Sequence, residues 1–526
     1  MRKLVLATAV AGLLAGGPAV QASDLEIVLA EDRVDHRTFD PRVTQSRHEE
    51  QVIVQIFDQL LSADENGNRH PGLAKSWQVS DDKLSYTFQL RDDVTFHDGT
   101  PFNAEAVKFT FDTIVDPELG SQGAVDIIGP YASTEVLGEH EVRVNYSRPY
   151  GAALGAFAET ELSIVSPTAV KEKGNNGFAQ SPVGTGPFKF VSWEKGKQID
   201  LERNDDYNWA PAWMSHQGPS QVSRATVRFI PDASTRVAAL EAGEVEASEL
   251  VPALDMRRFA AGDEFTTMVG NAAGLPFAAL FNTSRGVFVD KAVRQAFMHA
   301  VDRPTLAANL FFGFADPAYG PISASTPSYW SGNDAYYPFD LDKANALLDE
   351  AGWKMGDDGI RHKDGQPLSV YFPALLEPDT AVAVQADVRR VGFDVNVENV
   401  MKARQDELIF ANGYDMLVIR WVSNDPGVLS IPFHSRNIVE PGKFKFNWAR
   451  YADAGMDQML EDAESAATAE ARDELYAAIQ KQIMDEGIFL PIHNQVQTIA
   501  HTSELTGFRL AAGQWQVRFY EVKKAE

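Results

Sequence analysis

The sequence predicts an α/β fold of several domains. The chain has 526 residues, which is too long for a single hydrophobic core, so two or three cores are expected. Apolar residues make up 44% of the chain and charged residues 23%, as in ordinary folded proteins. After about residue 275, strand patterns and helix patterns alternate with short joints, which is typical of parallel βαβ units.

The first half of the chain mixes strands with a few helices. Apolar periodicity predicts helices at 52–61 and 104–114. Residues 97–101 predict a turn, because they contain Asp-Gly followed by Thr-Pro. Gly184 and Gly186 are expected to supply unusual backbone angles in a rigid connection between domains, at residues 181–188. Strand patterns lie at 25–30, 77–96, 141–146, 188–193, 198–203 and 225–229.

The second half is predicted as strands alternating with amphipathic helices. Asp290 is placed to cap one helix, and Gly352 to end another. Strands at 368–372 and 393–397 flank a helix that Asp379 is expected to cap, so the two strands should pair in parallel. The remaining predicted elements are two helices within 455–486 and a strand at 489–492.

The N-terminal segment differs in composition from the rest. Arg2 and Lys3 are followed by an apolar run at 4–14 and by small residues at 20–22. This pattern predicts a secretory signal peptide, residues 1–22, cleaved after Ala22, and the apolar run is too short for a membrane span. We therefore expect an exported protein located in the periplasm.

Charge and cysteine content restrict the function further. The formal charge is −27 and there is no cysteine. A strongly acidic chain is unsuited to nucleic acid, which is bound through Lys and Arg. The lack of cysteine excludes a lipidated N-terminal cysteine, thiolate metal sites and thiol nucleophiles. Such a chain suits the periplasm of a bacterium with two membranes.

The sequence contains no recognisable catalytic or cofactor motif. The two glycines at 184–186 are not followed by the third glycine of a dinucleotide-binding loop, and no G-x-S-x-G segment occurs. The eleven histidines are scattered, so neither a metal site nor a cofactor is expected. These observations favour a binding protein, which needs only a shaped cleft with a few polar groups.

A series of short motifs occurs along the chain in a characteristic order. It includes NRHPGLAKSW at 68–77, YTFQLR at 86–91, FHDGTPF at 96–102, SPVGTGPF at 181–188, RNDDY at 203–207, ALEAGE at 239–244, VRQA at 293–296, AVDR at 300–303 and LLDEAGW at 347–353. Together these motifs resemble the large periplasmic binding proteins of ABC importers for peptides, nickel and related solutes. The resemblance covers nearly the whole chain after the predicted signal peptide.

The resemblance implies a periplasmic binding protein-like fold of the cluster C type, with mixed sheets in two hinged lobes and an inserted third domain. Lobe I is expected at 23–55, 182–275 and 496–526, the inserted domain at 56–181, and lobe II at 276–495. Closure of the lobes about the hinge would bury the ligand and be sensed by the transporter.

The resemblance also implies that a few loops line the ligand cleft. His48 and Glu49 lie in the loop before the first long helix. Glu49 stands where some relatives place an acid that faces the positive end of the ligand; alternatively it is a carboxylate stabilised by the helix dipole. Trp330 lies in a Ser/Pro-rich loop, and the loop at 373–379 lacks the Arg that holds the ligand carboxylate in dipeptide-binding relatives.

The loop that follows the strand at 415–419 carries the other candidate ligand-binding residues. These are Arg420, Trp421, Ser423, Asn424 and Asp425. In peptide-binding relatives the third residue after this Trp is an Asp that pairs with the ligand ammonium, and here that place holds Asn424. Because Asn lacks the charge of the stronger contact, both Asn424 and the adjacent Asp425 remain candidates for this role.

We therefore predict the substrate-binding component of an ABC importer, which captures a peptide or peptide-like solute and delivers it to the permease. The protein is expected to act as a monomer, without nucleic acid, cofactor or catalysis. Neither end of a free dipeptide has a clear charged partner, and an unpaired buried charge is costly. The alternative is therefore an oligosaccharide or opine, stacked on Trp421, Trp330 and Tyr329. A secreted hydrolase is a further alternative, but no nucleophile and base are found in register.

Overall fold

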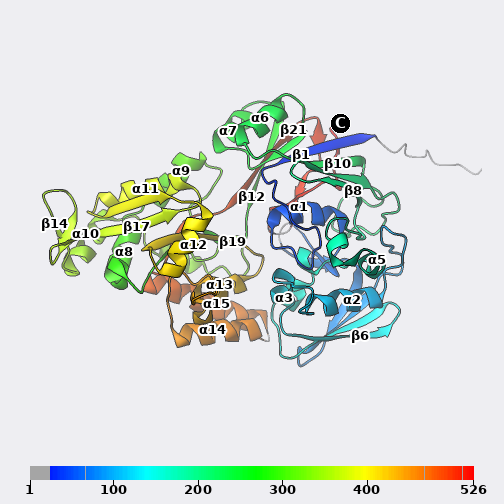
Figure 1. The fold of residues 1–526 in the computed structure, drawn as a ribbon, viewed down its shortest axis with the longest axis horizontal. Coiled ribbons are helices and arrows are strands. Elements are labelled where there is room, and N and C mark those ends of the chain that lie inside the picture. Colours follow the sequence, from blue (N-terminus) through cyan, green and yellow to red (C-terminus); the bar gives the residue numbers. More distant parts are fainter. Residues whose placement is uncertain (1–23, 65–66, 467, 512, 514) are drawn as a thin grey trace, which may run out of the picture.

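The computed structural model describes residues 24–526 except 65–66, 467, 512 and 514, so the predicted signal peptide lies outside the described residues. Figure 1 shows two parts, which lie side by side and are joined near the top of the view. Among the described residues, no helix is long and apolar enough to cross a membrane.

The part on the right of Figure 1, called lobe I below, is built around a seven-stranded mixed sheet. The central strand β1 (Leu25–Glu31) pairs in parallel with β10 (Val222–Phe229) and with β11 (Ala247–Glu249). The other strands, all antiparallel to their neighbours, are β8 (Phe188–Glu194), β9 (Gln198–Arg203), β12 (Phe265–Asn271) and β21 (Val496–Thr502). The strands predicted near residues 25, 188, 198 and 225 are confirmed.

A four-stranded antiparallel sheet continues lobe I below the first sheet. Its core is continuous with that of the seven-stranded sheet, because Ile27, Phe88 and Val227 belong to one buried cluster. The predicted helix α2 (Ala104–Ile114) is confirmed and is capped by Asn103. In order across the sheet, the strands are β4 (Ala74–Val79), β5 (Ser85–Leu90), β7 (Glu141–Tyr146) and β6 (Tyr131–Gly138). Other elements of lobe I are β2 (Leu61–Ala63), β3 (Arg69–Pro71), α1 (Arg47–Ile56), α3 (Gly123–Ile128), α5 (Pro167–Phe178), α6 (Ala233–Glu241) and α7 (Ala253–Ala260).

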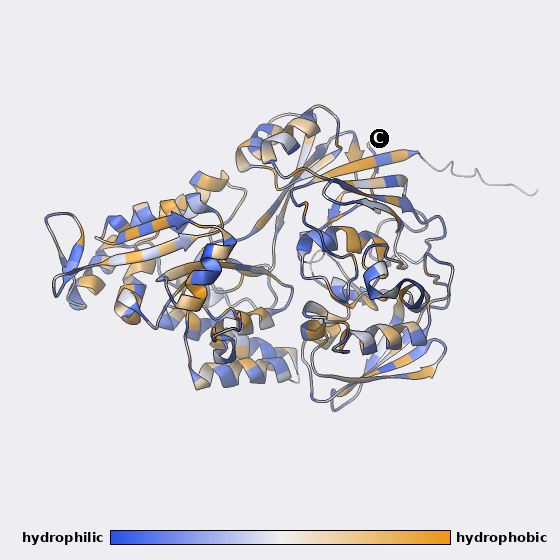
Figure 2. Cartoon of the chain, viewed as in Figure 1, coloured by the Kyte–Doolittle hydropathy of each residue, from blue (hydrophilic) through white to orange (hydrophobic). Residues whose placement is uncertain are grey.

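The part on the left, called lobe II, is centred on β13 (Gly274–Phe281), which lies between β19 (Met416–Val422) and β20 (Phe489–His493). Alternate residues of β13 enter two different buried clusters, Phe277 and Ala279 in one, Ala278 and Leu280 in the other. This alternation shows that both faces of the strand are covered. Helices and strands have hydrophobic and hydrophilic residues interleaved along their length (Figure 2), as amphipathic elements do.

The predicted βαβ unit of lobe II is confirmed. Strands β17 (Ser369–Ala374) and β18 (Asp394–Asn399) pair in parallel and are connected through α11 (Pro378–Arg389). Asp290 caps α8 (Lys291–His299) as predicted, its side chain accepting from the Ala292 backbone N–H. The other helices are α9 (Arg303–Phe311), α10 (Leu341–Glu350), α12 (Lys402–Ala411), α13 (Ser430–Phe433), α14 (Ala454–Ser465) and α15 (Ala469–Glu486).

The chain passes between the lobes at two neighbouring points. It leaves lobe I between β12 and β13 and returns between β20 and β21. At the crossing, the Ala272 N–H donates to the Gln495 carbonyl at 2.9 Å. Two adjacent connections of this kind are typical of a hinge.

Two predictions of helix ends are wrong. The helix expected at 52–61 is α1, which begins and ends about five residues earlier, because Leu61 enters strand β2. Asp379 lies inside the first turn of α11, whose N-cap position is Glu377.

The glycines at 184 and 186 are needed for a different reason from the one expected, since neither has a positive φ. A Cβ on Gly184 would lie 2.2 Å from the Ile56 carbonyl oxygen, and one on Gly186 would lie 2.8 Å from it. The connection therefore packs directly on the end of α1, where the Gly186 N–H donates to the same carbonyl at 2.8 Å.

Candidate functional site

The loop after β19 lies against lobe I. The Arg47 side chain, at the start of α1, donates from Nη2 to the Val422 carbonyl at 2.9 Å. The Asn424 amide donates to the Glu159 carboxylate, with Nδ2 3.3 Å from Oε1. Two residues of the predicted ligand-binding loop region are thus in contact with the opposite lobe.

Three carboxylates gather around the Arg47 guanidinium. Its Nη1 lies 2.6 Å from Glu50 Oε2, and the charges of Glu161 and Glu159 also act on it. Glu50 and Glu161 are 2% and 6% exposed, and Glu161 Oε2 has no hydrogen-bond partner among the residues that the structure describes. Arg69 adds a second positive charge near Glu159, so three carboxyl groups and two guanidinium groups lie together here. We call Glu50, Glu159 and Glu161 the acidic group.

Burial raises the pKa of two members of the acidic group. For Glu50, burial is the main cause, and Arg47 opposes it. For Glu159, burial is followed by the charge of Glu161, with Arg47 again opposing. Ionised carboxylates in such surroundings are stabilised by any further cation that comes within contact distance.

Asp425 is used inside lobe II. Both of its carboxylate oxygens accept from Arg472 Nη2, at 2.7 and 2.8 Å, and Oδ1 also accepts from the Gly427 N–H. Ser423 accepts from the Asp425 N–H through Oγ. Of the two candidates for the ligand ammonium, Asn424 is the one whose side chain reaches the other lobe, while the carboxylate of Asp425 has its own counter-ion.

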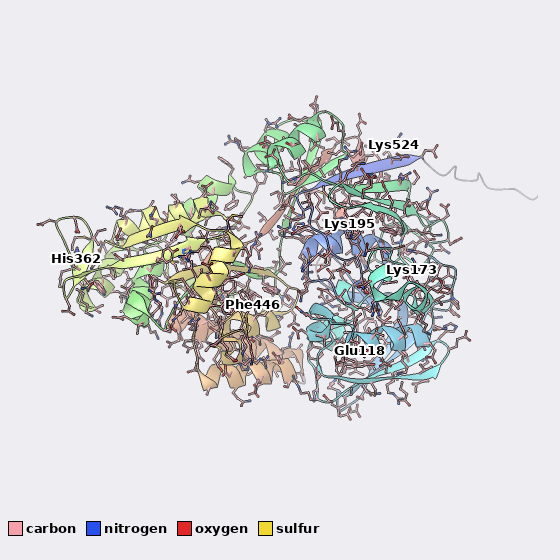
Figure 3. All side chains as sticks on the ribbon, viewed as in Figure 1. Glu118, Lys173, Lys195, His362, Phe446 and Lys524 are labelled. Carbon is pink, nitrogen blue, oxygen red and sulfur yellow. The ribbon has the colours of Figure 1, made fainter. Side chains whose placement is uncertain are left out.

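Trp421 and Arg420 are the most exposed residues of the predicted loop. Trp421 is 37% exposed, and its ring meets Phe446 edge to face at 5.2 Å. Phe446, labelled in Figure 3, belongs to lobe II. Arg420 Nη1 lies 3.9 Å from Glu377 Oε1. The exposed Trp ring offers an apolar face to a solute, so its predicted ligand contact stays a prediction.

Glu49 and Trp330 have partners within their own lobes. Glu49 is 2% exposed and its carboxylate accepts from the N–H groups of Arg37 and Thr38 and from the Thr44 hydroxyl. This favours a structural role for Glu49, namely holding the preceding loop on α1. The backbone of Trp330 donates to Gln480 of α15, and none of these contacts brings Trp330 to the loop after β19.

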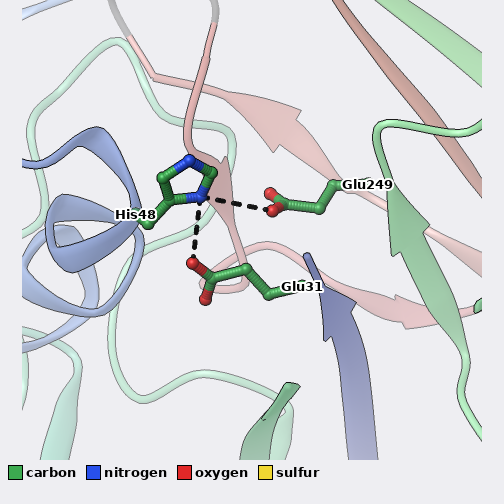
Figure 4. A group of neighbouring side chains, drawn as sticks. All are labelled: Glu31, His48 and Glu249. Carbon is green, nitrogen blue, oxygen red and sulfur yellow. Dashed lines mark ion pairs between the residues drawn. The ribbon is translucent and has the colours of Figure 1, made fainter. Parts of the chain in front are cut away.

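His48 belongs to a second group of titratable residues, shown in Figure 4. Its Nδ1 lies 3.1 Å from Glu31 Oε1 and 3.7 Å from Glu249 Oε1. Burial lowers the pKa of His48, but the Glu249 and Glu31 carboxylates outweigh this and raise it to about 10. Burial raises the pKa of Glu249, with Glu31 adding to the effect. Sequence reasoning named His48 but missed both carboxylates, which end the neighbouring parallel strands β1 and β11.

The chain is similar to several known proteins. The family model described as bacterial extracellular solute-binding proteins, family 5 middle, matches residues 68–437. The oligopeptide-binding protein AppA of Bacillus subtilis is 29% identical over 477 residues, which are 86% of this chain and 83% of that protein. The glutathione-binding protein GsiB of Escherichia coli (strain K12) is 26% identical over 516 residues, 96% of each chain. The solved structure of NikA from Brucella suis in complex with Fe(III)-EDTA has a TM-score of 0.82 at 26% identity, covering 95% of this chain and 100% of that one.

Proposed function

The chain belongs to family 5 of the bacterial extracellular solute-binding proteins, and on that basis we propose that it captures a peptide or peptide-like solute in the periplasm and delivers it to the membrane subunits of an ABC importer. The protein acts by binding alone, as a monomer, and releases its solute unchanged. Export depends on the predicted signal peptide, residues 1–22.

The observation that carries this proposal is the contact between the loop after β19 and lobe I. Arg47 bonds to the Val422 carbonyl at 2.9 Å, and Asn424 bonds to Glu159 at 3.3 Å. A solute held beside this loop is enclosed when the lobes close and released when these contacts open, which is what capture and delivery require.

The acidic group supports a solute with a positive charge. Glu50, Glu159 and Glu161 outnumber the two arginines near them, and a buried carboxylate without a partner is costly. An ammonium group supplies both the charge and several donors, and the Asn424 amide oxygen is a further acceptor. The names of the similar proteins AppA and GsiB specify an oligopeptide and glutathione, both of which carry an ammonium group.

The second candidate solute is an oligosaccharide or an opine. Trp421 favours it, because an indole ring that is 37% exposed beside Phe446 is suited to stacking on a sugar ring. Binding of such a solute would depend on Trp421 and would be insensitive to the charge of Glu159.

Within the part called lobe I above, residues 56–181 are proposed to form an inserted domain beside 23–55, 182–275 and 496–526, and both are proposed to close on lobe II (276–495). At its edge the Gly151 N–H donates to the Glu464 carbonyl at 3.2 Å, and Arg148 Nη2 lies 3.7 Å from the Glu464 carboxylate. These contacts join the inserted domain to α14, so opening the cleft must break them.

A thermal-shift screen of the mature protein tests the proposal. The panel contains dipeptides, longer peptides, glutathione, opines, and di- and trisaccharides, because any solute that binds the folded state raises the melting temperature. We expect peptides or glutathione to raise it. A rise with saccharides or opines alone would transfer the proposal to the second candidate, and a protein that responds to no member of the panel would contradict both.

A further inference from the structure

Lobe I contains a group of metal-ligand residues that the proposed function does not use. The ligand atoms of Glu31, His48 and Glu249 all lie within 4.8 Å of one another, and Figure 4 shows one nitrogen of the His48 ring facing both carboxylates. We propose that these three residues bind a divalent transition metal of the zinc class.

The spacing of the three side chains fits a metal ion. Ligand atoms at the usual distance from zinc, about 2.0–2.2 Å in tetrahedral geometry, stand about 3.4 Å apart. His48 Nδ1 is 3.1 Å from Glu31 Oε1 and 3.7 Å from Glu249 Oε1, so the observed separations lie on either side of that value. One imidazole with two carboxylates suits zinc, and the imidazole disfavours magnesium and calcium.

The sheet register holds the two carboxylates next to each other. Strands β1 and β11 are parallel, with Leu29 opposite Ala247 and Ala30 opposite Ser248. Continuing this register by one residue brings Glu31 opposite Glu249. Like charges in this position destabilise a sheet, and a positive charge beside them, from His48 or from a metal ion, offsets the repulsion.

The carboxylates are buried and incompletely satisfied. Glu31 is 0% exposed and Glu249 2%. Within the described part of the chain, Glu31 Oε2 and Glu249 Oε1 have no hydrogen-bond partner, and neither has Asp32 Oδ1. Arg236 is the nearby guanidinium, but its donors go to backbone carbonyls of Ile230, Pro231, Glu249 and Leu250. Buried carboxylate oxygens with no donor are the groups that a metal ion satisfies best.

The surroundings orient the proposed ligands. The Gln497 amide donates to Glu249 Oε2 at 3.2 Å, which leaves Oε1 on the side of His48. His36 Nε2 lies 3.1 Å from Glu31 Oε1, and the His36 ring stacks on Phe229 at 4.5 Å. Outer contacts of this kind fix ligand orientation in metal sites. The His48 side chain is 19% exposed, which gives an ion a route of entry.

The test is a zinc titration of the mature protein, freed of metal by chelation and containing no added solute. Calorimetry should show one tightly bound zinc ion per chain and no binding of magnesium. Glu249→Gln and Glu31→Gln should each weaken zinc binding by more than about 100-fold, and His36→Asn by about tenfold. The matched control is His70→Asn, which removes another histidine that pairs with a carboxylate, Asp64 at 3.0 Å, and should bind zinc as the unchanged protein does.

The glutamine variants are expected to fold, because each removes one of two facing negative charges. In both variants the rise in melting temperature caused by zinc should disappear. If a variant fails to fold, the absorption spectrum of the unchanged protein loaded with Co²⁺ decides the matter, and a tetrahedral spectrum supports the site. Zinc binding that survives both glutamine substitutions, an octahedral cobalt spectrum, or no binding at all would overturn the proposal. None of these results depends on which solute the cleft accepts.

Discussion

Replacing Asp425 by Asn is expected to destabilise lobe II and to leave solute binding nearly unchanged. The carboxylate pairs with Arg472 Nη2 at 2.7 and 2.8 Å and also accepts from the Gly427 N–H at 2.7 Å. Asn keeps an acceptor for that N–H, but it removes the counter-ion of Arg472, whose side chain is only 12% exposed.

The size of the loss follows from the burial of the pair. Removing one partner of a fully buried ion pair costs about 3–5 kcal/mol, and a hydrogen bond to a charged group contributes about 1.5–3 kcal/mol. The Asp425 side chain is 35% exposed, so solvent screens its charge. We therefore expect the free energy of unfolding to fall by about 2 kcal/mol.

Urea unfolding and calorimetry with the preferred peptide measure the two effects separately. Asp462→Asn on α14 is the matched control, since the Asp462 carboxylate accepts from the exposed Gln458 at 2.8 Å, and it should change neither quantity. A large loss of peptide affinity with an unchanged urea midpoint would contradict a stabilising role for the Asp425–Arg472 pair. It would make Asp425 the partner of the ligand ammonium.

Three further predictions concern the acidic group and the packing of lobe I. Burial raises the pKa of Glu159, and pairing with an ammonium lowers it, so Glu159 loses a proton when the peptide binds. Peptide affinity by calorimetry should therefore rise with pH, and Glu159→Gln should reduce this slope, to which Glu50 also contributes, and weaken binding roughly tenfold. Gly184→Ala would place a Cβ 2.2 Å from the Ile56 carbonyl oxygen and should lower stability by about 1–3 kcal/mol in urea unfolding, whereas Gly262→Ala, with its nearest atom at 3.8 Å, should not. Burial lowers the pKa of His97 to about 4 from 6.5; the unfolded chain therefore binds more protons between these values, and stability should fall by up to about 3 kcal/mol as the pH drops from about 6.5 to about 4. His97→Gln should remove that part of the pH dependence. If the variant keeps the pH profile of the unchanged protein, His97 is not the cause of the loss of stability.

Much of the fold could be predicted from local pattern. Helix α2 has the predicted bounds because an amphipathic stripe follows a capping Asn103. The parallel pairing of β17 with β18 follows from strand, helix and strand in close succession. Helix α1 was misplaced because its first turn is polar while the apolar residues after Ile56 belong to the next elements.

The candidate site was less predictable, because long-range contacts decide it. From the sequence, Asn424 and Asp425 were equal candidates for the partner of the ligand ammonium. The structure distinguishes them because Asp425 pairs with Arg472, which lies 47 residues away. The carboxylates of the proposed metal site are 218 residues apart in sequence and meet only through the register of β1 and β11. A strand was predicted at 25–30 but none at 247–249, so sequence pattern did not indicate that the two glutamates share one edge of the sheet.

Calorimetry of the mature protein with its preferred peptide and with the N-acetylated form of that peptide tests whether the acidic group selects the solute. Acetylation removes the positive charge that Glu50, Glu159 and Glu161 are proposed to attract. Affinity is expected to fall by at least about 100-fold on acetylation. Equal affinity for the two forms would show that the acidic group does not select the solute, and would contradict the proposed site.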